Sequence, residues 1–411
     1  MIAPNHRPSG FRARLARLAR LARFAAAGLI VPASALVSFS TPRSLEGAQA
    51  AQGAPDGMAL YEAGCASCHG SDGRGASADR IAFDDPLPDL TDCSFASREP
   101  DADWIIVSKA GGPVRGFSDV MPAFGEAFDD DQLQAVMDHI RTFCTDRTWP
   151  RGELNLPRPL FTEKAYPEDE WVWTTNANAE GPGAIVNELL YEKRFGSRNQ
   201  VEIALPFGFA EDSSTPASSD GGPASDWGVG LGDIEIGYKR ALLHNLRTIF
   251  SFGTEFKLPT GDSERGIGSA EFQIEPFLAL GQILPGDAFV HLQAGGGLLA
   301  RGHREFHGTA EHDEDVREAF FHAVLGRTYT SGEFGRSWSP MVEVLGSTHL
   351  AKGARPQWDL VPQMQVTLNT RQHVMLNVGV RVPLTDADVR STQFLVYFLW
   401  DWFDGGLFDG W

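Results

Sequence analysis

The strongest constraint on the fold is a period-two alternation of apolar and polar residues that starts near Glu170 and runs almost to the end of this 411-residue chain. In one run Val201 and Ile203 share a face, and Glu202 falls on the other. Because successive side chains of a β-strand point to opposite faces of a sheet, each run predicts one strand. Roughly twelve runs match this template. They begin near Glu170, Ala184, Asn199, Gly228, Leu246, Gly268, Asp287, Val316, Gly335, Arg355, His373 and Ser391.

The alternation alone does not show which face points inward, because a water-soluble β-sandwich alternates in the same way. Three features favour an outer-membrane barrel: short turns alternate with long polar loops, the strand number is even, and tryptophans cluster near strand ends. The short turns lie near Gly196, His244, Pro285, Ser331 and Thr370, and the long loops span 211–226, 259–267, 301–315 and 384–390. The tryptophans are Trp171, Trp173, Trp227, Trp338, Trp358, Trp400 and Trp402. We therefore expect an antiparallel, 12-stranded transmembrane barrel in contact with lipid, with both ends at the short-turn rim, which faces the periplasm.

The polar face of each strand would line the lumen of such a barrel. The predicted lumen residues are Glu202, Glu235, Lys239, Glu255, Lys257, Glu271 and Arg381. A separate loop, 302–315, holds three histidines among acidic residues, and without fixed spacing this composition favours a solvated loop over a metal site. The histidines are His303, His307 and His312.

A secretory signal peptide is predicted over residues 1–50. An arginine-rich head precedes an apolar stretch from Phe24 to about Phe39, and Ala48-Gln49-Ala50 is a small-residue cleavage pattern. A retained membrane anchor is the alternative, but the stretch is shorter than the ~20 apolar residues of a transmembrane helix. The formal net charge of −19 argues against nucleic acid as a partner, since phosphate binding needs a basic surface.

The segment between the signal peptide and the strands has helical patterning and predicts a small all-α unit over residues 51–147. Helices are expected over 56–64, 101–111 and 129–144, with loop over 70–100. Residues 148–167 contain four prolines and are expected to form a stiff, extended linker to the barrel at 168–411.

The motif Cys65-Ala66-Ser67-Cys68-His69 predicts covalent attachment of one haem c. Two thiols add to the two vinyl groups of the porphyrin, and the next residue, His69, is placed to bind the iron as proximal ligand. The alternatives are a disulfide or a zinc pair. A zinc site needs a second ligand pair at similar spacing, and the sequence has none.

The second axial ligand is predicted to be Met121, in a loop just before the last helix of the α unit. A thioether there raises the haem potential and closes the iron to substrates. Met58 and Met137 are the competing methionines, and both are interpreted as core residues on apolar helix faces. His139 is interpreted as a surface or haem-edge residue and not as a ligand.

Once the two motif cysteines are set aside, two cysteines are left, Cys93 and Cys144, and in an exported protein such a pair can form a disulfide. We hypothesise that they pair with each other. Two buried free thiols are the alternative, because the sequence does not give the Cα separation that a disulfide requires.

Residues 56–147 resemble a class I cytochrome c, on Leu60-Tyr61, the Cys65–His69 motif followed by Gly70, glycines 73 and 75, and Met121-Pro122. In that family the methionine matching Met121 is the distal ligand, so the resemblance implies the same role here. Residues 168–402 resemble more loosely the outer-membrane barrels associated with phenol degradation, on Val201–Phe209 and the stretch from Gly232 to Tyr238.

The sequence therefore favours an exported electron carrier, not an enzyme: a periplasmic cytochrome domain tethered to an outer-membrane barrel, with periplasmic redox proteins as partners. A second hypothesis is a porin or transport protein for small molecules, to which the cytochrome is an accessory. A third is a haem enzyme such as a peroxidase, which needs an open sixth position on the iron.

Overall fold

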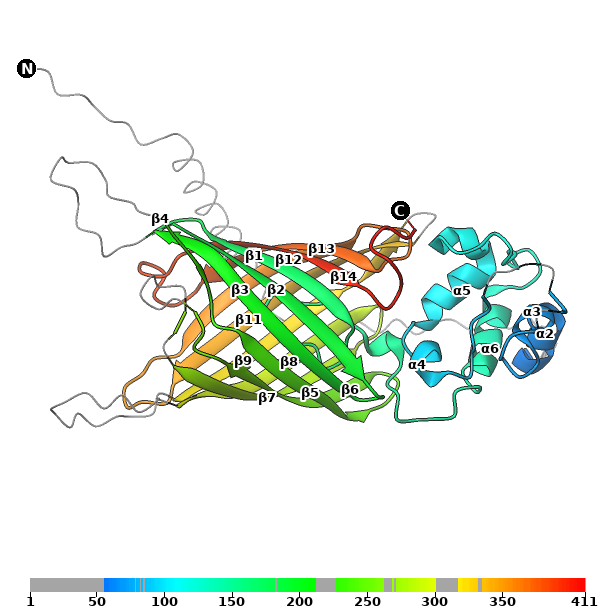
Figure 1. Cartoon of the computed structure of the whole chain (residues 1–411), viewed down its shortest axis with the longest axis horizontal. Coiled ribbons are helices and arrows are strands. Elements are labelled where there is room, and N and C mark those ends of the chain that lie inside the picture. The colour runs from blue at the N-terminus through cyan, green and yellow to red at the C-terminus, as the bar shows by residue number, and fades with distance from the viewer. Residues whose placement is uncertain are drawn as a thin grey trace, which may run out of the picture.

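The computed structural model describes residues 55–77, 79–81, 83, 86–181, 183–211, 227–261, 268–269, 271–300, 317–331 and 335–410. The predicted signal peptide and the loop with His303, His307 and His312 lie outside these residues. A small helical domain sits at one end of a long β-barrel (Figure 1). The chain is thus multidomain, with the α unit before the β unit, as predicted.

The helical domain is built from short helices joined by glycine-rich turns. They are α2 (Gly57–Gly64), α3 (Ala66–His69), α4 (Cys93–Ala96), α5 (Asp101–Ala110), the 3-10 turn η1 (Gly112–Arg115) and α6 (Asp130–Ile140). Asp129 caps α6 in a capping box with Gln132, and α5 ends at Gly111, whose φ of +89° favours glycine. The three predicted helices are confirmed, although α6 ends at Ile140, four residues before the predicted end. Helix α4 was expected to be loop, because a four-residue helix is too short to show a period of 3.6 residues.

Helices α2 and α6 cross closely and enclose the core of the domain. A Cβ at Gly57 would lie 2.0 Å from the carbonyl oxygen of Ala135, so the crossing requires glycine. The core is Tyr61, Leu90, Val136, Met137 and Ile140. Met137 is therefore a core residue, as predicted. The same expectation for Met58 is wrong, because its side chain is 53% exposed in the first turn of α2.

The barrel is a closed antiparallel sheet of twelve strands. Its strands are β1 (Glu170–Asn178), β2 (Ala184–Phe195), β3 (Asn199–Glu211), β5 (Glu235–His244), β6 (Thr248–Lys257), β7 (Phe272–Ile283), β8 (Ala288–Ala300), β9 (Arg317–Arg327), β11 (Arg336–His349), β12 (Gln357–Thr367), β13 (Val374–Pro383) and β14 (Gln393–Asp401). Each pairs with the next in this order, and β14 pairs with β1, from Glu170↔Asp401 to Asn178↔Gln393. Two short extensions, β4 (Trp227–Leu231) and β10 (Tyr329–Ser331), pair with β3 and β11.

The predicted strand starts lie within a few residues of the observed ones, except for the run expected from Gly228. That run is split into β4 and β5. Between them the Gly232 N–H donates to the carbonyl oxygen of Pro206, and a Cβ at Gly232 would lie 2.8 Å from the Pro206 ring. Because Pro206 has no N–H to give to the ladder, regular pairing is interrupted here.

Polar side chains point into this barrel and apolar side chains point out, which is the reverse of a water-soluble sandwich. Along β3, Val201 is 41% exposed, while its neighbour Gln200 is 0% exposed. Exposed tryptophans lie near the strand ends on both rims: Trp171, Trp227, Trp338 and Trp358. A closed barrel with an apolar outer belt and aromatic girdles is an outer-membrane protein. Among the described residues, no helix combines the length and apolar character needed to cross a bilayer.

Residues 148–169, which we call the plug, run inside the barrel. Leu154 and Tyr166 are buried against Ile249 and Phe277 of the wall, and Leu156 is buried against Phe289. We expected a spacer over 148–167. Its prolines do give an extended backbone. Prolines favour an extended backbone in an exposed segment and in a buried one alike, so the sequence does not show that this segment is buried.

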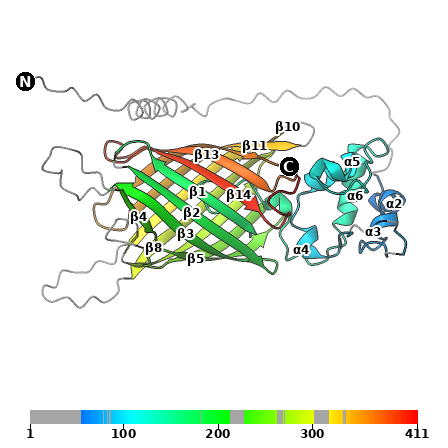
Figure 2. The same cartoon turned by 45° about the horizontal axis from the view of Figure 1, so that its top comes forward.

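The helical domain docks against the rim that carries both barrel ends (Figure 2). Arg371, in the β12–β13 turn, donates to the carbonyl oxygens of Arg115 and Gly116 at 3.3 and 3.0 Å. Arg98 pairs with Asp169 and covers the ring of Phe403, 3.7 Å from its centroid. The two domains are therefore in contact through fixed charged groups, beyond their chain connection.

Candidate functional site

The motif cysteines and His69 lie on one tight helical turn: Cys65 joins α2 to α3, and Cys68 and His69 end α3. The Cys65 N–H donates to the carbonyl oxygen of Tyr61 at 2.8 Å, which closes α2. The N–H groups of Cys68 and His69 both donate to the Cys65 carbonyl oxygen, at 3.2 and 2.9 Å. The turn is stabilised further by the Tyr61 hydroxyl, which donates to the Gly70 carbonyl oxygen at 2.8 Å.

Both motif cysteines are free thiols. Burial and the neighbouring Cys68 raise the pKa of Cys65 to about 11, so the Cys65 thiol stays protonated at neutral pH. Two free thiols on one turn are what addition to two vinyl groups requires.

His69 is suited to bind a metal ion. Burial lowers the pKa of its imidazole, which favours the neutral form that metal ligation needs. Its Nδ1 is buried, and no described residue forms a hydrogen bond with it. The thiol pair, the neutral ring and this unpartnered nitrogen fit a covalently attached haem with His69 as an axial ligand.

The Met121 loop is fastened to α5 by its backbone. The Gly112 N–H donates to the Met121 carbonyl oxygen at 3.0 Å, and the Phe124 N–H donates to the Ser108 carbonyl oxygen at 2.9 Å. A Cβ at Gly112 would lie 2.1 Å from the Ser118 carbonyl oxygen, so the loop returns too closely for any residue but glycine.

The same loop reaches the haem motif through two aromatic rings. Phe124 and Phe128 stack with centroids 5.8 Å apart. A Cβ at Gly64, the residue before Cys65, would lie 3.3 Å from Phe124 and 3.0 Å from Phe128. Met121 is thus in a loop held between α5 and the first motif cysteine. Its competitor Met137 is in the core, and His139 packs between the rings of Tyr61 and Phe143, at 5.3 and 5.1 Å.

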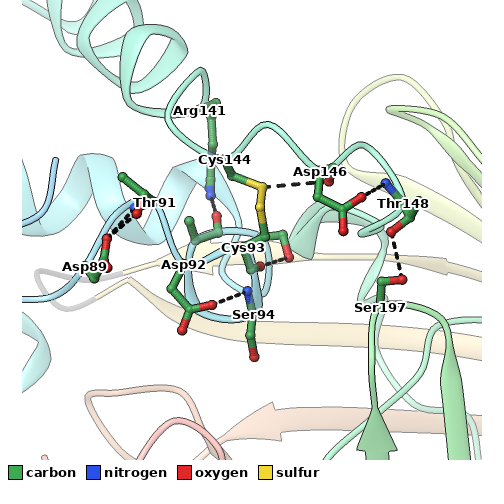
Figure 3. The surroundings of a disulfide bond; sticks show 12 residues. Asp89, Thr91, Asp92, Cys93, Ser94, Arg141, Cys144, Asp146, Thr148 and Ser197 are labelled. Carbon is green, nitrogen blue, oxygen red and sulfur yellow. Dashed lines mark hydrogen bonds between the residues drawn. A yellow bond between two sulfur atoms is a disulfide. The ribbon is translucent and has the colours of Figure 1, made fainter. Parts of the chain in front are cut away.

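A disulfide joins Cys93 to Cys144, with their Cα atoms 5.0 Å apart (Figure 3). It connects α4 to the chain just beyond α6. Asp92 caps α4 by accepting from the Ser94 N–H at 2.8 Å, and Arg141 donates to the Ala96 carbonyl oxygen beside the bridge. Because Cys93 and Cys144 pair with each other, Cys65 and Cys68 remain as the two free thiols.

A zinc pair finds no support in the part of the chain that the structure describes. Clusters of three possible metal ligands occur there only among carboxylates of the plug and barrel. They are Glu163, Glu192 and Glu202, and Glu168, Glu170 and Asp401. Neither cluster involves the motif cysteines.

The helical domain can be assigned to a family. Residues 52–140 match the family model described as cytochrome c oxidase, cbb3-type, subunit III. This segment is a c-type cytochrome domain. The match includes Cys65, Cys68, His69 and Met121, and a cytochrome domain implies haem binding and electron transfer. No curated protein matches the chain.

Several solved outer-membrane barrels are similar to the C-terminal part. The COG4313 outer membrane channel from Pseudomonas putida F1 is 15% identical, with a TM-score of 0.41 over 60% of this chain and 99% of that one. The KdgM porin is 10% identical, with a TM-score of 0.35 over 56% and 98%. The NanC porin is 6% identical, with a TM-score of 0.37 over 56% and 98%. These likenesses concern the fold alone, which the closed strand pairing already establishes.

The barrel lumen contains most of the residues predicted for it. Lys239 is fully buried there, and Glu202, Glu235, Glu255, Lys257 and Arg381 face the same interior space. Glu271 was expected there too, but it precedes the first residue of β7 at the rim.

The charged residues of the plug were missed. Arg158 pairs with Glu192 at 2.9 Å, and Lys164 pairs with Glu168 and Glu170 at 2.6 and 3.2 Å. No local signal in the sequence reveals them, because several of their partners lie on strands that are distant along the chain.

Proposed function

We propose that this protein is an electron carrier whose covalent haem is held by Cys65, Cys68 and His69 on the periplasmic side of the outer membrane. The observation that carries the proposal is the single turn on which two free thiols and a neutral, half-buried imidazole lie together. A haem bound there would supply an iron that alternates between Fe(III) and Fe(II).

The chain's own residues perform the remaining tasks. The Cys65 and Cys68 sulfurs would hold a haem through thioether bonds, and His69 would bind its iron. Met121 would supply a second, thioether ligand from a loop that backbone hydrogen bonds hold against α5. An iron that took both of these ligands from the chain would exchange electrons without binding a substrate, which favours a carrier over a peroxidase.

The docked interface gives the carrier a fixed place at the membrane. Contacts of Arg371 with Arg115 and Gly116, and of Arg98 with Asp169, hold the domain against the rim. Thr148 adds a hydrogen bond of 2.8 Å to Ser197, in the β2–β3 turn (Figure 3). Because this rim carries the short turns, it faces the periplasm, and the partners are periplasmic redox proteins.

The test is the visible spectrum of the oxidised protein and of two methionine variants. Methionine ligation gives a weak charge-transfer band at the near-infrared edge of the spectrum. Met121→Ala should lose this band and become able to bind cyanide, while Met58→Ala, at an exposed methionine, should keep it. A wild-type haem that is already high-spin and binds cyanide at once would contradict the carrier and favour the enzyme.

A further inference from the structure

The plug is recognised by the barrel wall through its backbone. The side chains of Asn377 and Tyr397 donate to the Arg158 carbonyl oxygen at 3.3 and 2.6 Å. Three strands away from β14, on β3, Gln200 accepts from the Glu168 N–H at 2.6 Å. A buried backbone group without a partner is costly, and here inward-facing polar side chains of the strands provide the partners. The wall is therefore built to hold this segment.

Ion pairs hold the plug at its middle. Arg158 pairs with Glu192 at 2.9 Å and with Glu170 at 3.4 Å, and both carboxylates are buried. Lys239 of the wall pairs with Glu163 of the plug at 3.3 Å. Removing one partner of such a buried set leaves uncompensated charge, which is far more costly than the intact set is stabilising.

The lumen is hollow on both sides of the plug. A cavity of about 440 Å³ lies toward the long-loop rim, and the plug residues from Arg158 to Glu163 form part of its lining. A second cavity, of about 550 Å³, lies toward the cytochrome domain. Arg158 lines both cavities, so the plug stands between two spaces that would otherwise be continuous.

Carboxylates outnumber cations in the wall of the first cavity. Lys257 is paired with Glu235 at 2.7 Å, and Arg381 with Asp359 at 2.6 Å. Five further carboxylates face the same space and form no ion pair with a described residue: Glu188, Glu202, Glu255, Glu275 and Glu318. Once such a passage is open and filled with water, its excess of carboxyl groups attracts cations and repels anions.

We propose that the barrel is a cation-selective channel that its own plug closes, and that displacing the plug opens a path for small hydrated cations. This activity goes beyond electron transfer and does not depend on the haem.

Planar-bilayer recordings of the full-length protein test the proposal, with a potassium chloride gradient across the membrane. The wild type should be closed for most of the recording. Arg158→Gln should increase the conducting time by at least about tenfold, because Glu192 and Glu170 lose their shared partner. Arg240→Gln is the control: Arg240 is exposed, its partner is Asn199, and it does not contact the plug.

A second variant separates a loosened plug from a misfolded barrel. Tyr397→Phe removes one hydrogen bond to the plug backbone and leaves every charge in place. It should increase conduction less than Arg158→Gln, and heat-modifiable gel migration should show a folded barrel in both. If both variants are folded and conduct no more than the wild type, the plug is no gate. Steady conduction by the wild type would also overturn the proposal.

Selectivity is read from the reversal potential of the open Arg158→Gln channel. The reversal potential should have the sign expected of a cation-selective pore. Adding Glu188→Gln and Glu255→Gln to the channel should make the reversal potential smaller. An anion-selective reversal potential would overturn the assignment of cations.

Discussion

Loss of the Cys93–Cys144 disulfide should strongly destabilise the cytochrome domain. The bridge spans 51 residues of sequence, and this closed loop contains α5, the Met121 loop and α6. For a loop of this length, the entropy that cross-linking removes from the unfolded chain corresponds to about 4 kcal/mol. That is a large share of the total of about 5–15 kcal/mol for a small domain. The unfolding free energy of Cys93→Ala/Cys144→Ala should fall by this order.

The assay is a urea titration of the detergent-solubilised protein, followed by the haem absorption of the cytochrome domain. Both cysteines are replaced together, because a single leftover thiol could pair with Cys65 or Cys68 during export. Reductant added to the wild type should reproduce the loss, since thiols cleave disulfides and leave thioethers intact. A double variant within about 1 kcal/mol of the wild type would refute the loop-entropy argument.

Three further predictions concern the same domain. Gly57→Val should cost about 3 kcal/mol in a urea titration, because its side chain would overlap the Ala135 carbonyl at the α2–α6 crossing, and an unchanged midpoint would contradict this. Arg141→Met should lower the unfolding free energy by about 3–5 kcal/mol, because the buried guanidinium donates to Asp101 at 2.7 Å and to two backbone carbonyls. A loss near zero would show that Arg151 alone satisfies Asp101. Burial raises the pKa of Asp103 from 3.8 to about 6, so the stability that Asp103 contributes is present in full below pH 3.8 and is lost as pH rises through about 6. Asp103→Asn should reduce this dependence of the unfolding free energy on pH. If the dependence survives the substitution, it belongs to another group.

The sequence predicts the elements whose signals are local. The spacing of Cys65, Cys68 and His69 is a covalent requirement, and it predicts the turn on which the structure places all three. The alternation along β3 predicts both the strand and its polar face, because a barrel wall gives each side chain only two directions.

What the sequence does not predict depends on contacts that are distant along the chain. The plug is an extended segment, and its burial follows from distant partners. Glu343 accepts a hydrogen bond from the Thr162 N–H, and the Tyr397 hydroxyl donates to the Arg158 carbonyl oxygen. Met58 has the helical spacing of a core residue but falls outside the α2–α6 contact. The break between β4 and β5 depends on which residue of β3 lies opposite Gly232, and strand register is not a local property.

The central claim is a covalent haem on an exported, membrane-bound chain. Its most direct test is the intact mass of the protein purified from the outer-membrane fraction, together with haem staining on a denaturing gel. We predict a mass above that of the mature polypeptide by one haem and a stained band, both lost in Cys65→Ala/Cys68→Ala. A folded, membrane-inserted wild-type barrel with the bare polypeptide mass and no stain would contradict the account.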